Sequence, residues 1–199
     1  MHETRTPTRD STTLGILAGG QATRLGGRDK AWLRRDGVPQ VLRIARAFAP
    51  YVSAVLVSAN GHRAAYAAHG LRMVADRHAA LGPIGGLDAL AAACGTPWLF
   101  TLPVDAVHAD ASWLDRLLQA AAAGQGAWLE DDAGPQPLAA VWRVDRLRAA
   151  TTCAIAEGTL AIHALHARLG DACVRIEGLR LGNLNTPADL AAAGVDESK

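Results

Sequence analysis

The chain has 199 residues, half of them hydrophobic and one fifth charged, and its formal net charge at pH 7 is +1. This length suits one α/β domain with a sizeable core. The balanced charge argues against nucleic-acid binding and against a membrane-surface role, because proteins of those classes usually carry a basic excess or stripe.

Cysteine usage and the first residues give no sign of an exported protein. Cys94, Cys153 and Cys173 lie far apart without a Cys-x-x-Cys pair, so neither a disulfide framework nor a structural zinc site is expected. Residues 1–13 are polar, lack the apolar stretch of a signal peptide and are predicted to form a flexible tail. No apolar run approaches the ~20 residues of a membrane span. We therefore expect a cytoplasmic protein with one domain over residues 14–199.

Strand and helix patterns alternate along the chain from residue 14 onward. Short apolar runs bounded by turn residues predict strands at 14–18, 52–57, 71–74, 98–102, 127–129, 138–142 and 173–176. Apolar residues at helical spacing predict helices at 41–48, 62–69, 87–94, 112–122, 145–156 and 160–169, with a short turn or helix at 31–33. Asp110 or Ser112 is the expected cap of the helix at 112–122, and Thr186 followed by Pro187 is an N-cap with proline in the first turn.

The first strand leads into a glycine-rich loop that also carries Arg24 and Lys30. Glycine lets the backbone approach a ligand closely, and backbone N–H groups beside two cations suit a triphosphate. The spacing is not that of a Walker A loop, because no lysine follows glycine or precedes Ser or Thr. It is not a dinucleotide fingerprint either, because Gly19-Gly20 does not supply Gly-x-Gly-x-x-Gly.

A few carboxylates and histidines elsewhere in the chain are further candidates for site residues. Asp105 follows the buried strand at 98–102. A buried carboxylate at the end of such a strand needs a cation or hydrogen-bond donors. The alternative is that Asp105 caps a helix or lies in a solvated turn. The acidic run at 130–132 is consecutive and is predicted to be a solvated turn. His163 and His166 share a helical face without further ligands nearby, so we expect partly exposed polar residues there.

The glycine-rich loop reads Leu-Ala-Gly-Gly at Leu17 to Gly20, three residues, then Arg24, Leu25, Gly26, Gly27, one residue, Asp29 and Lys30. This pattern resembles the signature of the molybdenum cofactor guanylyltransferases, or MobA-type enzymes. Three further landmarks similar to that family follow in the same order, which are Gly-Pro-Ile-Gly-Gly at 82–86, Asp105, and Asn-x-Asn-Thr-Pro at 183–187.

The resemblance implies a three-layer α/β/α domain with a mainly parallel sheet, of the Rossmann-like, GT-A-type nucleotide-diphospho-sugar transferase fold. It also implies guanylyl transfer: a terminal phosphate of molybdenum-molybdopterin attacks the α-phosphorus of GTP, which releases pyrophosphate and forms the guanine dinucleotide cofactor. The cofactor implied is Mg²⁺. A molybdoenzyme or its chaperone is the expected acceptor of the product, and neither nucleic acid nor a membrane is an expected partner.

The resemblance also assigns roles to individual residues. Arg24, Lys30 and Asp105 are expected to be catalytic, with Asp105 as the magnesium ligand. Residues of the loop and of strand ends are expected to bind the nucleotide, namely Leu17, Ala18, Gly19, Gly20, Lys30, Ser58, Asp76 and Asp105. Residues expected to bind the acceptor substrate are Gly82, Pro83, Gly85, Asn183 and Asn185.

The chain departs from the family pattern at two places. The proline that usually follows the metal-binding Asp is missing, because the chain reads Val104-Asp105-Ala106-Val107. Ser58 stands where the family has an Asn beside the guanine, and Asn60 follows two residues later. The second departure leaves strict preference for GTP open, although Asp76 is suited to accept hydrogen bonds from guanine.

Three alternative functions follow from these departures. Molybdopterin cytidylyltransferases have a related loop, but it usually reads Leu-Ala-Ala-Gly, unlike Gly19-Gly20. Sugar-phosphate nucleotidyltransferases space the Arg and Lys more widely and place proline before the lysine, unlike Asp29-Lys30. A catalytically idle nucleotide-binding or partner-binding module is the third alternative, and the retention of Arg24, Lys30 and Asp105 together argues against it.

Overall fold

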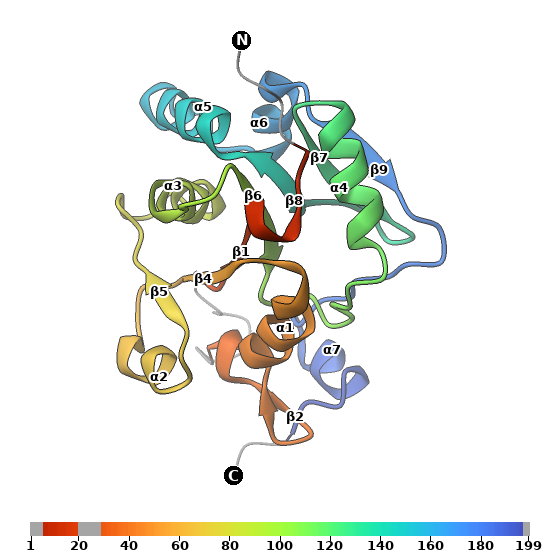
Figure 1. Cartoon of the computed structure of the whole chain (residues 1–199). Helices are drawn as coiled ribbons and strands as arrows, with labels where there is room; N and C mark the ends of the chain where they lie inside the picture. The colour runs from red at the N-terminus through yellow and green to blue at the C-terminus, as the bar shows by residue number, and fades with distance from the viewer. Residues whose placement is uncertain (1–5, 20–28, 197–199) are drawn as a thin grey trace.

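The computed structural model describes residues 6–19 and 29–196. A seven-stranded sheet with helices on both faces forms its centre (Figure 1). The strand order is β5-β4-β1-β6-β8-β7-β9. The bounds are β1 (Thr12–Leu17), β4 (Ala54–Ser58), β5 (Arg72–Val74), β6 (Trp98–Pro103), β7 (Gly126–Asp131), β8 (Gly134–Arg143) and β9 (Ala172–Arg175), with a separate hairpin of β2 (Arg34–Arg35) and β3 (Val38–Pro39).

The sheet is mainly parallel, as predicted. Strands β5, β4, β1 and β6 run parallel to one another. Strand β8 is antiparallel to both β6 and β7, because it returns from a tight hairpin, and β9 pairs with β7 in parallel.

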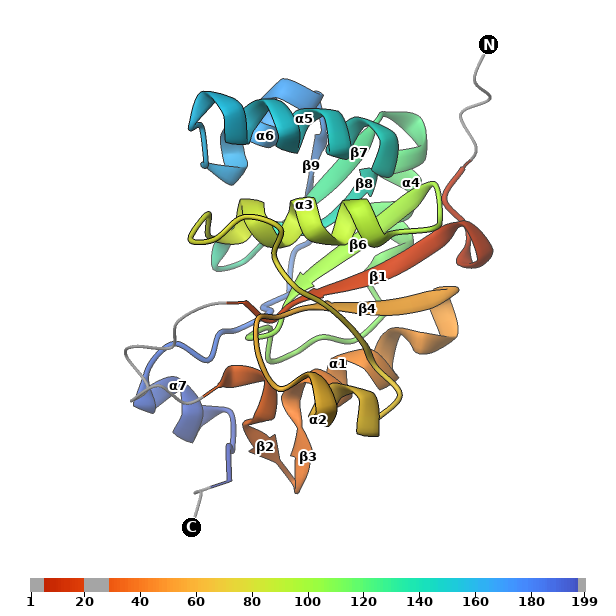
Figure 2. The same cartoon turned by 90° about the vertical axis from the view of Figure 1, so that its left-hand side faces the viewer.

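Helices cover the sheet in two layers (Figure 2). One layer holds α1 (Gln40–Phe48) and α4 (Leu114–Ala123), with Tyr66 of α2 (Arg63–Ala68) in the same apolar cluster. The opposite layer holds α3 (Pro83–Ala93), α5 (Val144–Glu157) and α6 (Ile162–Leu169). Helix α7 (Pro187–Ala192) lies beside the β2–β3 hairpin, and short 3-10 helices are η1 (Arg9–Ser11), η3 (Lys30–Trp32) and η4 (Ala49–Tyr51). No helix within the described ranges is long and apolar enough to cross a bilayer.

Strand β1 begins two residues earlier than predicted. Thr12 and Thr13, which we expected in the N-terminal tail, are buried members of the strand. Ser53 donates its N–H to the Thr12 carbonyl at 2.9 Å, and the Thr13 and Thr96 hydroxyls lie 2.8 Å apart. These hydrogen bonds satisfy the Thr12 carbonyl and the Thr13 hydroxyl, and apolar patterning in the sequence does not reveal such partners.

Two predicted helix starts were wrong. Helix α3 begins at Pro83, so most of the predicted loop at 82–86 is its first turn. Proline fits there because the first N–H groups of a helix have no partner inside the helix, and Gly82 before it takes a positive φ of 58°. Helix α4 begins at Leu114, and Asp110 accepts from the Ser112 N–H at 2.8 Å in the preceding turn instead of capping the helix.

The acidic run at 130–132 is a solvated turn only at Asp132, which is exposed in the turn after β7. Glu130 and Asp131 belong to β7, and Asp131 is fully buried. Its carboxylate accepts backbone N–H groups from Leu181 and Ala133, each at 2.8 Å. These donors replace the water that the prediction assumed.

His166 is buried, against the expectation that both histidines of α6 are partly exposed, whereas His163 is exposed. The Nδ1 atom of His166 lies 2.8 Å from Asp171 Oδ2, and its Nε2 atom lies 2.8 Å from the Pro137 carbonyl. The ring stacks on Trp142 at a centroid distance of 4.3 Å. Partners distant in the sequence therefore make this polar residue part of the interior.

Candidate active site

Strand β1 is the point at which the order of strands in the sheet switches from one side to the other. From β1 the chain continues to β4 and β5 on one side, and it later places β6 on the other side. Leu17, the last residue of β1, is in register with Ser58 of β4 and with Pro103 of β6. Ligands of open α/β sheets bind at such a point, outside the carboxyl ends of the strands. The glycine-rich loop leaves β1 there, between the predicted residues on β4 and those after β6.

Three predicted residues from distant parts of the chain meet at this edge. Lys30 Nζ donates to Asp105 Oδ2 at 3.0 Å and to Asn185 Oδ1 at 2.5 Å. The side chains of Lys30 and Asp105 are each 20% exposed. The ammonium group is therefore held between two oxygens and still faces solvent, so an anionic ligand can reach it.

Local packing places Lys30 at the start of η3. Asp29 caps this turn by accepting from the Ala31 N–H at 2.9 Å. The Trp32 ring packs against Tyr66 of α2 at a centroid distance of 4.9 Å. Burial, followed by the negative charge of Asp29, raises the pKa of the Tyr66 phenol, which therefore stays neutral at this packing contact.

Hydrogen bonds from α1 and from the β2–β3 hairpin hold the loop that carries Asp105. Gln40 Nε2 donates to the Ala106 carbonyl and Arg35 donates to the Val107 carbonyl, each at 2.8 Å. On the other side of Asp105, the Val104 N–H donates to the Leu17 carbonyl at 3.0 Å. This loop lacks the family's proline, and the hydrogen bonds fix its path instead.

The capping box of α7 holds Asn185. Thr186 accepts from the Asp189 N–H at 3.1 Å, which confirms the predicted N-cap. Asp189 in turn accepts the N–H groups of Asn185 and Thr186, and hydrogen bonds from Thr186 are the main reason that the pKa of Asp189 lies below its ordinary value. Within the described ranges, Asn183 is exposed and makes no side-chain hydrogen bond, so its role in substrate binding stays a prediction.

A second polar cluster lies at the ends of β4 and β5. Ser58 Oγ donates to Asp76 Oδ1 at 3.3 Å, and Asn60 Nδ2 donates to Asp76 Oδ2 at 2.8 Å. The Asp76 N–H also donates to Asn60 Oδ1 at 3.0 Å, so Asn60 and Asp76 bind each other reciprocally. Asn60 was absent from the predicted nucleotide-binding residues, although its place two residues after Ser58 was the available signal.

The first turn of α3 lies against this second cluster. A Cβ added at Gly85 would lie 3.6 Å from Asp76 Oδ2, and one added at Gly86 would lie 2.9 Å from Ser58 Oγ. Gly82 and Pro83 are exposed at the start of the helix. The glycines thus let the helix approach Asp76 and Ser58 closely, while the predicted contact of Gly82, Pro83 and Gly85 with a substrate stays a prediction.

The loop after β1 is described only in part. The Ala18 N–H donates to the Ser58 carbonyl at 2.9 Å, so this amide is occupied and unavailable for a phosphate. A Cβ added at Gly19 would meet nothing within 4 Å. Gly20 and Arg24 lie outside the described residues, and their predicted roles stay predictions.

The donor set at Lys30 fits a hard divalent cation. Mg²⁺ prefers oxygen ligands and is typically held by one or two carboxylates together with substrate phosphates and water. Asp105 and Asn185 already present oxygens to a cation, the Lys30 ammonium group. Among the described residues, no three His, Cys, Asp or Glu side chains are grouped as a metal cage, so any such ion would depend on ligands from the substrate.

Comparisons with known proteins agree with this fold. Residues 14–171 match the model of the MobA-like NTP transferase domain. A molybdenum cofactor guanylyltransferase from Cereibacter sphaeroides is 36% identical over 89% of this chain and 93% of its own length. One from Pseudomonas paraeruginosa is 40% identical, but the match spans 53% of this chain and about half, 54%, of that relative.

Solved structures show the same fold at low sequence identity. Molybdopterin-guanine dinucleotide biosynthesis protein A from Archaeoglobus fulgidus has a TM-score of 0.72 at 21% identity, covering 92% of this chain and 96% of that one. The 2-C-methyl-D-erythritol 4-phosphate cytidylyltransferase from Thermus thermophilus has a TM-score of 0.69 at 20% identity, with the same coverage. The family match covers most of the chain, and the chain belongs to the MobA-like NTP transferase domain family.

Proposed function

We propose that this protein is a molybdenum cofactor guanylyltransferase, which transfers GMP from GTP to the phosphate of molybdenum-molybdopterin. The observation that carries the proposal is the contact of Lys30 with both Asp105 and Asn185 at the carboxyl edge of the sheet. The names of the relatives from Cereibacter sphaeroides and Pseudomonas paraeruginosa support the choice of reaction.

The reaction needs alignment and charge neutralisation more than covalent help. An oxygen of the acceptor phosphate forms a bond to the α-phosphorus, the bond from that phosphorus to the β-bridging oxygen breaks, and the electron pair leaves with pyrophosphate. Lys30 would bind the triphosphate as negative charge moves onto this leaving group. No general base is required when the attacking phosphate is already ionised.

Asp105, with Asn185 beside it, would hold Mg²⁺. When bound there, the ion would neutralise phosphate charge and act as a Lewis acid. The two side chains now share one ammonium group, so nucleotide binding would require Lys30 to exchange at least part of these contacts for phosphate oxygens. Arg24 completes the predicted set of phosphate-binding cations.

The base would lie at the second cluster. Asp76 presents a carboxylate held by Ser58 and Asn60, and an ionised carboxylate accepts from the N1–H and exocyclic amine of guanine. Cytosine at neutral pH has a ring nitrogen acceptor in place of the N1–H, so one of the two hydrogen bonds would be lost. Asp76 therefore favours GTP over CTP, although Ser58 replaces the family's Asn.

Acceptor binding and delivery form the outer part of the proposal. Gly82, Pro83, Gly85, Asn183 and Asn185 are the proposed contacts of molybdenum-molybdopterin, and a molybdoenzyme or its chaperone is the proposed recipient of the product. A cytoplasmic location belongs to the same proposal.

Pyrophosphate release tests the proposal. The protein is incubated with molybdenum-loaded molybdopterin and with GTP, CTP or ATP, each with and without Mg²⁺. We expect release with GTP that stops when Mg²⁺ is removed. Release with CTP in preference to GTP would favour the cytidylyltransferase alternative, and no release with any nucleotide would favour the idle binding module.

A further inference from the structure

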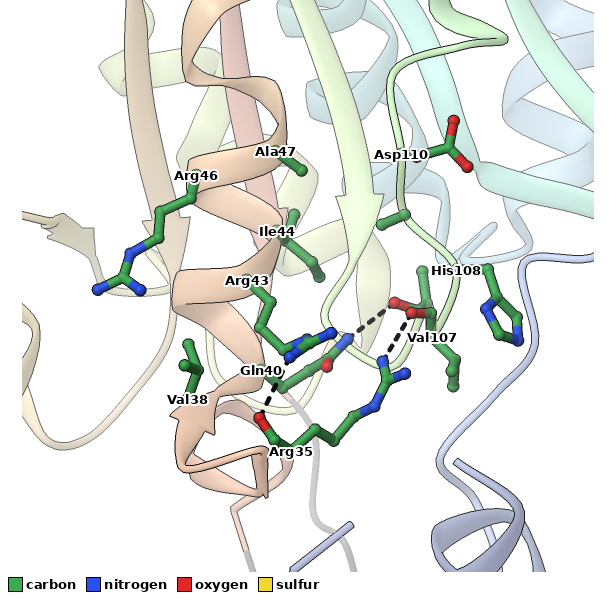
Figure 3. Close-up of a pocket in the computed structure, with 12 residues that line it drawn as sticks. Arg35, Val38, Gln40, Arg43, Ile44, Arg46, Ala47, Val107, His108 and Asp110 are labelled. Atoms are coloured by element: carbon green, nitrogen blue, oxygen red, sulfur yellow. Dashed lines mark hydrogen bonds between the residues drawn. The ribbon is translucent and has the colours of Figure 1, made fainter. Parts of the chain in front are cut away.

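A cavity of about 470 Å³ lies outside the candidate active site (Figure 3). Its walls come from the β2–β3 hairpin, from α1 and from the loop that follows Asp105. Of the described residues, none that we place at the nucleotide or the metal lines it. The cavity is therefore a separate site to explain.

Two arginines in this cavity are poorly compensated by negative charge. Among the residues that the structure describes, Arg35 donates only to the carbonyl oxygens of Val107 and Ala193, each at 2.8 Å. Arg43 donates to the Arg35 carbonyl at 3.1 Å and to Asp36 Oδ2 at 3.3 Å. The Asp36 side chain is 88% exposed, so its charge is screened by water. Burial and, after it, the charge of Arg43 lower the pKa of Arg35, and the charge of Asp36 offsets part of this effect.

Gln40 adds an acceptor without a donor. Its side chain is 1% exposed, and while Nε2 donates to the Ala106 carbonyl, Oε1 accepts no hydrogen bond from the described residues. An unpaired buried acceptor costs about 1–3 kcal/mol. Figure 3 shows the Gln40 amide directed into the space between Arg35 and Arg43.

The other polar residues of the cavity do not converge on this point. Arg46, His108 and Asp110 line the cavity, but the ends of their side chains point away from Gln40 in Figure 3. The convergent groups are therefore two guanidinium groups and one amide oxygen. This set calls for an anion that also carries a hydrogen-bond donor.

We propose that this cavity binds a small phosphate-bearing molecule, with its phosphate at Arg35 and Arg43, and that a shift of the neighbouring side chains on binding opens the buried Gln40 Oε1 to a P–OH or adjacent hydroxyl of the ligand. Guanidinium groups match phosphate oxygens with paired, charge-assisted hydrogen bonds. The volume lies within the roughly 300–1,000 Å³ typical of small-molecule sites and leaves room beyond the phosphate itself.

Calorimetric titration with inorganic phosphate tests this site. All proteins are full-length and carry Lys30→Ala, because Lys30 would also attract phosphate at the active site. Arg43→Gln is the test variant, since its side chain is 34% exposed and its replacement is compatible with folding. Arg46→Gln is the matched control, because it removes the same charge from the same helix but at a guanidinium group that points away. Acetate at equal ionic strength is the control ligand.

We expect phosphate to bind the Lys30→Ala protein and its Arg46→Gln variant alike, and the Arg43→Gln variant at least tenfold more weakly. The proposal is overturned when phosphate does not bind the Lys30→Ala protein, or when Arg43→Gln has no effect. It is also overturned when Arg46→Gln weakens binding as much as Arg43→Gln, or when acetate binds as tightly as phosphate. None of these results depends on guanylyl transfer, so the proposed function is tested separately.

Discussion

Two acid–base pairs with similar N···O distances lie in different environments in this molecule. The distance is 2.8 Å between His166 Nδ1 and Asp171 Oδ2, and 3.0 Å between Lys30 Nζ and Asp105 Oδ2. The first pair is 4% and 2% exposed, and the second is 20% exposed on both sides. Distance alone therefore does not separate a structural pair from a site for ligands.

The surroundings of the two pairs explain their different roles. His166 stacks on Trp142 and Trp128, and its second ring nitrogen meets the Pro137 carbonyl. Both ring nitrogens thus lie within hydrogen-bond distance of oxygen atoms inside the protein. Lys30 and Asp105 instead lie at the carboxyl edge of the sheet and are partly exposed, so a ligand can add to their contacts or replace them.

The largest expected effect comes from breaking the exposed pair. Lys30→Ala or Asp105→Ala should lower kcat for pyrophosphate release by about 100-fold or more, because each removes charge that stabilises the transition state. The free energy of unfolding should change by no more than about 1 kcal/mol, since a solvent-facing pair contributes little. Kinetics and urea unfolding of the same preparations measure both, and unchanged kcat would remove that residue from the mechanism.

Breaking the buried pair should do the reverse. Asp171→Ala should lower the free energy of unfolding by about 3–5 kcal/mol, because it leaves His166 without its buried partner. The matched control is His163→Ala on the exposed side of the same helix, which should cost less than about 0.5 kcal/mol. Urea unfolding gives both values. A loss at Asp171 no larger than at His163 would show that the buried pair has no structural role.

The second cluster should affect binding more than chemistry. Asn60→Ala removes a donor to Asp76 and its reciprocal backbone contact, so KM for GTP should rise about tenfold, or ~1.4 kcal/mol, with kcat within a factor of about two. KM for CTP is the internal control and should rise less, because cytosine would make one hydrogen bond to Asp76 where guanine makes two. An equal rise for both nucleotides would place Asn60 in folding or phosphate binding instead.

The smallest expected effect concerns the close approach of α3. Gly86→Ala places a Cβ 2.8 Å from Leu17 Cδ2 and 2.9 Å from Ser58 Oγ, whereas Gly85→Ala meets nothing closer than 3.4 Å. Gly86→Ala should therefore cost about 1 kcal/mol of stability and raise KM for GTP severalfold, while Gly85→Ala should leave stability equal or higher. Thermal unfolding and GTP kinetics of the two variants measure the difference, and equal behaviour would contradict the packing argument.

Local patterns predicted the alternation of strands and helices and the polar residues after some strands, whereas the parallel sheet and the roles of the site residues came from the family resemblance. Strand β6 and its exit to Asp105 were readable from an apolar run, and the Thr186-Pro187 cap was readable from two adjacent residues. Asn185 reaches Lys30 across 155 residues of sequence, and only the resemblance to a known family placed the two in one site.

The errors have a common physical cause, which is long-range pairing of polar groups. Asp131 and His166 looked solvated because their donors and acceptors, Leu181 and Pro137, lie far along the chain. The start of α3 was missed because Gly and Pro usually mark loops, although Pro83 suits a first helical turn. Asn60 was passed over because its contact with Asp76 depends on the pairing of β4 with β5.

Identification of the reaction product by mass spectrometry tests the central claim most directly. The wild-type protein and the Lys30→Ala variant are each incubated with Mg²⁺, GTP and molybdenum-loaded molybdopterin, and the molecular mass of the pterin product is measured. We predict molybdopterin joined to GMP with the wild-type protein and almost none with Lys30→Ala. Formation of free GMP without this adduct, or equal adduct from both proteins, would contradict guanylyl transfer at the Lys30–Asp105–Asn185 site.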